Sequence, residues 1–172
     1  MSDILTQLLR RVQSVNDGLN TGAFVRDVVM RHEADIMELQ KQQLFEGKAA
    51  NGEDIRPYYS EDLKPGGYFY SVESAGRYAA WKQDGVAYPY TANRNPDAPN
   101  LYVNGKFHSE LGVEFGADYV LVRGMTSYAD NIVNKYGLRT FGLMAENWSR
   151  LFAERNGLNE LMDGLKRILY VL

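Results

Sequence analysis

The chain has 172 residues, a mass of 19.5 kDa and a net charge of −3. With 45% hydrophobic and 24% charged residues, its composition is that of one folded domain over residues 1–172 rather than of a disordered chain. The absence of cysteine excludes disulfides, thiol catalysis and Cys-ligated metals, while the evenly spread charge and short apolar runs predict no membrane and no sequence-specific nucleic-acid partner.

The N-terminal part predicts two helices. Residues 3–15 carry apolar side chains at three-to-four spacing, and the run Asn16-Asp17-Gly18 is a stop signal. A longer helix is expected from Thr21, a candidate N-cap, to about Phe45, with Gly47 as its C-cap.

The middle of the chain, residues 48–99, is rich in proline and tyrosine, and we call it the insertion. All five prolines and seven of the twelve tyrosines lie there, and turn dipeptides occupy most of it. One helix is predicted over residues 72–82, with Ser71 as its cap. Because long irregular segments are usually functional and dense aromatic residues favour burial, we expect a contact segment rather than disorder.

The C-terminal part predicts a hairpin followed by helices. Alternation over residues 101–115 indicates a strand that Gly105 can divide, and residues 119–123 form the return strand after a turn at 116–118. A short helix is expected from a Thr126 cap to Tyr136. Residues 144–171 then place apolar side chains on one helical face, which Asn156-Gly157 can split.

Together these elements predict an α+β fold. A small antiparallel sheet, the hairpin of about residues 101–123, is packed by the long N-terminal helix and the C-terminal helices. The insertion interrupts this arrangement as a long irregular segment.

The residue patterns that carry chemistry in enzymes are weak here. His108 and Ser109 are adjacent in a predicted strand and would point to opposite faces, which argues against a catalytic triad. The acidic pairs Glu53-Asp54 and Glu61-Asp62 lack the spacing of a calcium loop, and no glycine-rich phosphate loop is present. We therefore predict no catalytic, cofactor-binding or metal residues; a hydrolase using a loop carboxylate pair is a third, competing hypothesis.

The aromatic residues of the insertion are the predicted partner contacts. Tyrosine, tryptophan and arginine supply most interface hot spots. The same residues could instead pack within the fold or stack on a ligand, but the local charge of −1 disfavours phosphate. The expected anchors are Tyr58, Tyr59, Tyr68, Phe69, Tyr70 and Trp81.

Two stretches resemble proteins of tailed bacteriophages and prophages of gut Bacteroidales. The first is Gln40-Lys41-Gln42-Gln43-Leu44-Phe45-Glu46-Gly47-Lys48, followed by Asn51-Gly52 and Ile55-Arg56-Pro57-Tyr58-Tyr59-Ser60. The second, Pro99-Asn100-Leu101-Tyr102-Val103-Asn104-Gly105-Lys106-Phe107-His108-Ser109, is similar to the strand entry of phage neck proteins, the tail-completion or head–tail joining family. The order of long helix, motif, hairpin and C-terminal helix is also that of the family.

The resemblance implies a structural virion protein without catalytic residues. Such a protein assembles in the bacterial cytoplasm as a ring of identical copies at the head–tail junction or tail end, against adjacent neck or tail proteins. The insertion would then contact neighbouring subunits. The alternative is a non-catalytic adaptor that uses the aromatic loop to bind a glycan or a protein partner.

Overall fold

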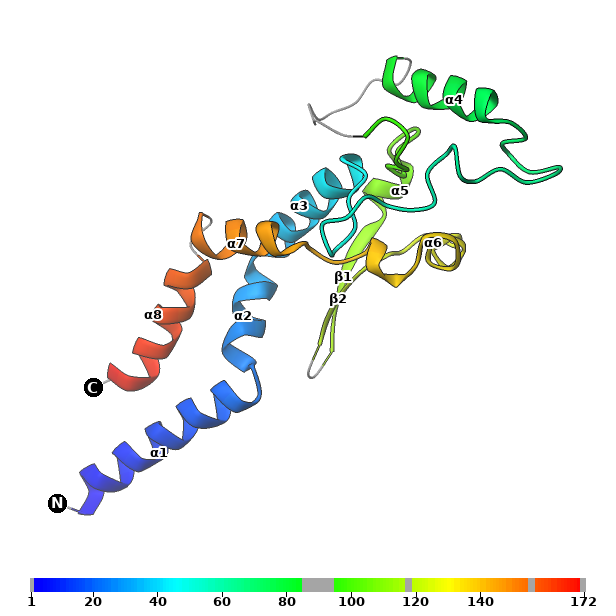
Figure 1. Cartoon of the computed structure of the whole chain (residues 1–172). Helices are drawn as coiled ribbons and strands as arrows, with labels where there is room; N and C mark the ends of the chain where they lie inside the picture. The colour runs from blue at the N-terminus through cyan, green and yellow to red at the C-terminus, as the bar shows by residue number, and fades with distance from the viewer. Residues whose placement is uncertain (1, 85–94, 117–118, 155–156, 171–172) are drawn as a thin grey trace.

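The computed structural model describes residues 2–84, 95–116, 119–154 and 157–170, and these form the α+β fold that the sequence predicts (Figure 1). The described residues contain eight α-helices, one short 3-10 helix and a two-stranded antiparallel sheet. In chain order they are α1 (Ser2–Asn20), α2 (Ala23–Arg31), α3 (Glu33–Phe45), α4 (Val72–Asp84), α5 (Lys106–Ser109), β1 (Leu111–Phe115), β2 (Val120–Gly124), α6 (Ala129–Tyr136), η1 (Leu138–Thr140), α7 (Ala145–Ala153) and α8 (Gly157–Tyr170).

The first helix is longer than predicted, and the expected stop at residues 16–18 is wrong. α1 continues to Asn20, and the break falls at Gly22, whose φ of 67° is left-handed. Thr21 does not cap α2, because its hydroxyl donates instead to the carbonyl of Asp17 at 2.7 Å.

The long helix predicted over residues 21–46 is divided at His32, where φ is −99° and ψ is 20°. The buried His32 ring lies between two carboxylates, with Nδ1 2.7 Å from Asp35 and Nε2 3.2 Å from Glu160 of α8. This change of direction lets α2 pack against α8 while α3 packs against β1. The C-cap of α3 is Glu46, and the predicted Gly47 follows it as the left-handed glycine that ends the helix, with a φ of 75° and its N–H donating to the carbonyl of Leu44.

The hairpin is shorter than the sequence indicated. β1 and β2 pair in the register Leu111↔Gly124 to Phe115↔Val120. Of the residues 101–115 predicted as a strand, only the last third is therefore a strand. Gly105, with a φ of 79°, and the Asn104 side chain, which accepts from the Lys106 N–H at 3.1 Å, start the helical turn α5 instead. The return strand is confirmed within one residue.

The predicted helix ends are largely confirmed elsewhere. Ser71 caps α4, because Ser71 and Ser74 each accept a hydrogen bond from the other's N–H. α6 ends at Tyr136, as expected, with Gly137 as its C-cap, but its N-cap is Tyr128, and Thr126 contributes no side-chain cap. The split of the last helical stretch into α7 and α8 is also confirmed, although Asn156 lies outside the described residues.

Helix α3 is central to the core. One cluster joins it to the sheet and α7, and another joins its end to α5 and the start of the insertion. A separate third cluster lies within the insertion and α4. The members of the first are Val29, Ile36, Leu39, Val113, Val122, Leu143 and Leu151, and those of the second are Leu44, Ala49, Ile55, Phe107 and Leu111.

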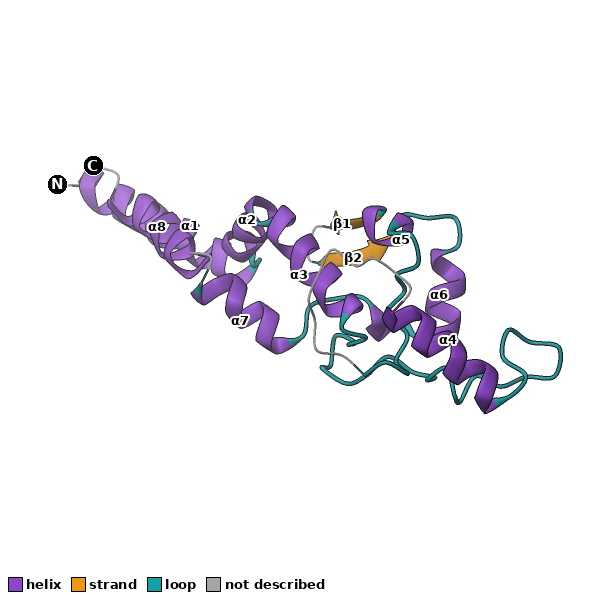
Figure 2. Cartoon of the chain, turned by 90° about the horizontal axis from the view of Figure 1, so that it is seen from above, coloured by secondary structure: helices purple, strands orange, loops and turns teal. Residues whose placement is uncertain are grey.

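The molecule is elongated, with different elements at its two ends. Helices α1 and α8 lie side by side as an arm, with the start of α1 and the end of α8 near its tip (Figures 1 and 2). Helix α4 and the loop before it form the opposite end, beyond the hairpin and α6. No helix among the described residues is long and apolar enough to span a membrane.

Candidate interaction surfaces

The structure divides five of the six predicted aromatic anchors into a buried and an exposed group. Tyr59 is 7% exposed and Phe69 4%. Their ring centroids lie 5.7 Å apart, and both side chains pack against Ala75 and Ala79 of α4. The half-buried ring of Tyr78 lies 5.0 Å from that of Tyr59. These side chains hold α4 onto the insertion as a small core.

The second group forms an exposed surface that we call the aromatic face: Tyr68, Tyr70 and Trp81. Tyr68 is 75% exposed and Tyr70 73%, while Trp81 is about half exposed. Contacts with Tyr78 orient two of them, with ring centroids 5.4 Å apart for Tyr68 and 5.5 Å for Trp81. Exposed aromatic side chains that are already ordered lose little entropy on binding, so this face suits a partner contact.

Tyr58 belongs to neither group, because its side chain is engaged within the chain. Its hydroxyl donates to Asp54 at 2.7 Å, and the Arg56 guanidinium lies 4.1 Å from its ring centroid. Hydrogen bonds from Lys48 and then from Tyr58 lower the pKa of Asp54 to about 2. The hydrogen bond to Asp54 raises the pKa of Tyr58.

We expect the two aromatic groups to respond differently to truncation. Tyr59→Ala removes a buried ring and should lower the free energy of unfolding by about 3 kcal/mol, whereas Tyr70→Ala should change it by less than about 0.5 kcal/mol. Urea denaturation of both variants measures this difference. Equal losses would contradict the assignment of Tyr59 to the core and Tyr70 to the surface.

The four carboxylates of the acidic pairs all have cationic partners. Asp54 pairs with Lys48, and Glu61 with Arg56. The other two join the insertion to the C-terminal part, through Asp62 to Lys135 of α6 and Glu53 to Arg139 of η1. Within the described ranges no cluster of three or more acidic or histidine side chains is placed to hold a metal ion.

His108 and Ser109 lie on α5 rather than on a strand. His108 is 3% exposed, and its Nε2 lies 3.0 Å from the carbonyl oxygen of Asn100. The Ser109 hydroxyl donates to the carbonyl of Lys106 at 2.8 Å. Both groups therefore make backbone contacts that stabilise the turn between residue 100 and β1.

The arm exposes apolar side chains from the predicted apolar stripes of its two helices. Leu9 and Val12 of α1 and Leu158 and Met162 of α8 are each about half exposed or more. The amphipathic patterns correctly predicted the helices. They did not show that the apolar stripe of each helix is wider than the surface that the other helix covers. We call these four residues the arm face.

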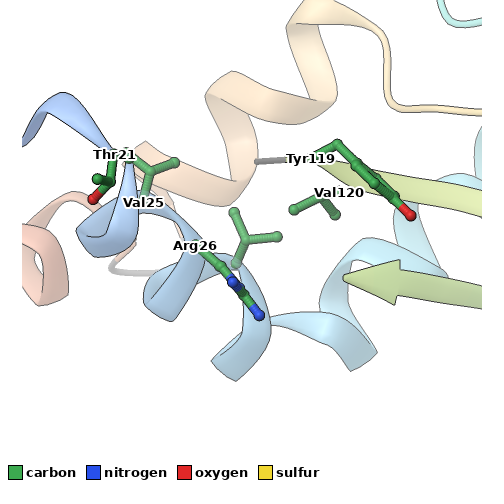
Figure 3. A pocket seen from close by; sticks show the side chains of 7 residues that line it. Thr21, Val25, Arg26, Tyr119 and Val120 are labelled. Atoms are coloured by element: carbon green, nitrogen blue, oxygen red, sulfur yellow. The ribbon is translucent and has the colours of Figure 1, made fainter. Parts of the chain in front are cut away.

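Two hollows lie beside the hairpin. A cavity of about 310 Å³ separates α2 from the start of β2, with Val25 and Arg26 on one side and Tyr119 and Val120 on the other (Figure 3). A larger groove of about 520 Å³ runs along β2 and is bounded by α6 and by residues 138 and 141. The cavity could not be placed from the sequence, because it joins α2 to the start of β2, which is distant along the chain. The groove lies within residues 121–141, and its shape depends on how α6 and η1 pack beside β2.

No protein-family model, no curated protein and no solved structure matches this chain.

Proposed function

We propose that this protein is a structural, non-catalytic subunit of a tailed-phage or prophage virion. In this proposal it assembles as a ring of identical copies at the head–tail junction or tail end, and contacts adjacent neck or tail proteins. The observation that supports assembly is the presence of two unlike apolar surfaces, the arm face and the aromatic face, at opposite ends of the elongated molecule.

Two unlike surfaces suit a ring. A closed ring needs heterologous contacts, in which one surface of each subunit meets a different surface of the next. A symmetric dimer would instead use one self-complementary surface. Apolar side chains gathered at both ends of an elongated subunit support the first arrangement, because such groupings mark interaction sites.

The polar groups also support a structural role. The carboxylates of the two acidic pairs bind cations of the same chain, and the Ser109 hydroxyl binds a backbone carbonyl. These partners stabilise the insertion and α5 rather than presenting a nucleophile beside a base. The position in the virion rests on the resemblance of residues 40–60 and 99–109 to phage neck proteins.

The mass of the purified protein in solution tests ring assembly. Light scattering over a concentration series, with negative-stain imaging, should reveal a closed ring and give its subunit number. A monomer at every concentration would contradict self-assembly.

Charges introduced on the arm face should prevent assembly without unfolding the chain. Leu9→Lys with Val12→Lys places two cations in the expected contact and should reduce the mass to that of a monomer. Gln13→Lys, at a neighbouring exposed polar position on the same helix, is the matched control and should assemble normally. Normal assembly of the double variant would exclude the arm face from the ring contact.

The exposed aromatic face favours one second candidate, a module that binds a glycan or another protein. Rings such as those of Tyr68 and Trp81 can stack on sugars as well as on protein side chains. A glycan array separates the two functions, because specific glycan binding by a monomer would favour the adaptor.

A further inference from the structure

The outer edge of β2 has unpaired backbone groups. The N–H of Met125 donates to the carbonyl of Glu110, and the N–H of Gly116 donates to the carbonyl of Tyr119. In an antiparallel pair only every second residue bonds across to the partner strand, so these two bonds show which residues of β2 face β1. It follows that Val120, Val122 and Gly124 turn their N–H and C=O groups away from β1. These groups make no hydrogen bond within the described part of the chain, although Val122 and Gly124 are buried residues.

An unpaired strand edge that lines a groove can take up another extended chain. Buried backbone N–H and C=O groups are nearly always paired, and a two-stranded sheet is marginally stable alone. The groove of about 520 Å³ runs along the same strand, and Leu121, Met125 and Leu138 on its wall are exposed. An open edge beside an apolar groove is the arrangement that accepts an added β-strand.

The loop before α4 carries a segment with the matching pattern. The side chains of Tyr68 and Tyr70 are exposed, while Phe69 between them is buried and its carbonyl accepts from the Lys64 N–H at 3.1 Å. The backbone groups of Tyr68 and Tyr70 have no partner in the described ranges. Alternate residues with free backbone groups are what an added strand presents to an edge.

Within one subunit the loop and the edge are apart. Figures 1 and 2 both place the loop at the end of the molecule beside α4, away from β2. The segment that pairs with β2 must therefore come from another copy.

We propose that residues 68–70 of one subunit add as a strand to the free edge of β2 in the next subunit. Tyr68 and Tyr70 then occupy the groove between β2 and α6, and the edge groups of Val122 and Gly124 gain hydrogen-bond partners. This inference rests on the proposed ring, because it requires a second copy of the chain. It makes the groove along β2, rather than the arm face, the surface that receives the aromatic face, and leaves the arm face to a separate contact in the ring.

Disulfide trapping tests the contact cleanly, because the chain has no cysteine of its own. Tyr68→Cys and Leu121→Cys are prepared separately, mixed under assembly conditions and oxidised. A disulfide-linked pair should form from the mixture, with more than tenfold less from either variant alone. Tyr68→Cys mixed with Val103→Cys, which is exposed but does not line the groove, is the matched control.

The outcomes separate this inference from the proposed function. A ring that forms without the 68–121 disulfide overturns the strand addition but leaves ring assembly standing. A disulfide between Leu121→Cys and Val12→Cys instead would assign the groove to the arm of a neighbour and also overturn it. A monomer at all concentrations overturns both.

Amide hydrogen exchange provides a second readout. In the assembled protein the amides of Val122 and Gly124 should exchange at least tenfold more slowly than in the dilute monomer. Tyr68→Ser with Tyr70→Ser should remove that protection while leaving the amides that bond β1 to β2 protected. Equal exchange in the ring and the monomer would contradict an added strand.

Discussion

Replacing Gln43 by leucine is expected to lower the free energy of unfolding by about 3 kcal/mol or more. The side chain is 1% exposed, and its Nε2 donates to the carbonyl of Gly142 at 2.9 Å. Its Oε1 accepts from the N–H of Met144 at 2.9 Å and from the Asn147 amide at 3.1 Å. Leucine fills the space but leaves these three groups unpaired, at about 1 to 3 kcal/mol each.

Urea denaturation of the full chain measures this loss. Gln42→Leu is the matched control, because Gln42 is half exposed and contacts Glu38 of its own helix; it should change the free energy of unfolding by less than about 0.5 kcal/mol. A loss below about 1 kcal/mol for Gln43→Leu would show that the buried network contributes little.

The position of Gln43 explains why the loss should be large. Gln40, one helical turn earlier, accepts from the N–H of Gly142 at 2.8 Å, so two glutamines of α3 hold the segment that leads into α7. That segment also directs the chain toward α8 and the arm. We therefore expect Gln43→Leu to weaken ring assembly as well as the fold.

The free energy of unfolding should fall by up to about 3 kcal/mol as the pH falls from 6.5 to 4, because of His108. Burial lowers the pKa of His108 to about 4, the nearby Lys41 and Lys82 act in the same direction, and the hydrogen bond with Asn100 opposes them. Between pH 4 and 6.5 the unfolded chain binds a proton at this residue and the folded chain does not, so acid favours unfolding. Stability is then regained as the pH rises through 6.5.

Unfolding measured at pH 7 and pH 4.5 tests this dependence. His108→Gln can still donate to the Asn100 carbonyl but does not titrate, so its unfolding free energy should vary much less over this range. An unchanged pH dependence in His108→Gln would assign the acid sensitivity to other groups.

Residues 40–48 contain two buried glutamines whose role only the structure shows. In the sequence, Gln40 and Gln43 are two polar residues within a helical pattern, and nothing in the pattern indicates that both are buried. Their partners lie about a hundred residues further along the chain. The spacing of residues along one helix cannot predict such a network, because it reflects only neighbours on that helix.

The candidate contact surface was predictable in part. The composition of the insertion directs attention to its aromatic residues, but it could not distinguish Phe69, which is buried, from its exposed neighbours Tyr68 and Tyr70. From the sequence alone, truncating Tyr58, Tyr59 and Tyr70 together is expected to abolish assembly and leave the fold intact. Because Tyr59 is buried, that triple variant would damage the fold, and Tyr68 with Tyr70 is the better choice.

The sequence by itself determined the α+β class, the hairpin, and helices α4, α6, α7 and α8. These elements follow from caps, turn residues and periodicity, which depend on a few neighbouring residues and can therefore be recognised in the sequence. Only the tertiary structure decided the bend at His32, the turn at α5, the exposed arm face and the free edge of β2. Each of these depends on which distant segments pack together and which faces they leave uncovered. Local backbone preferences do not determine this long-range packing.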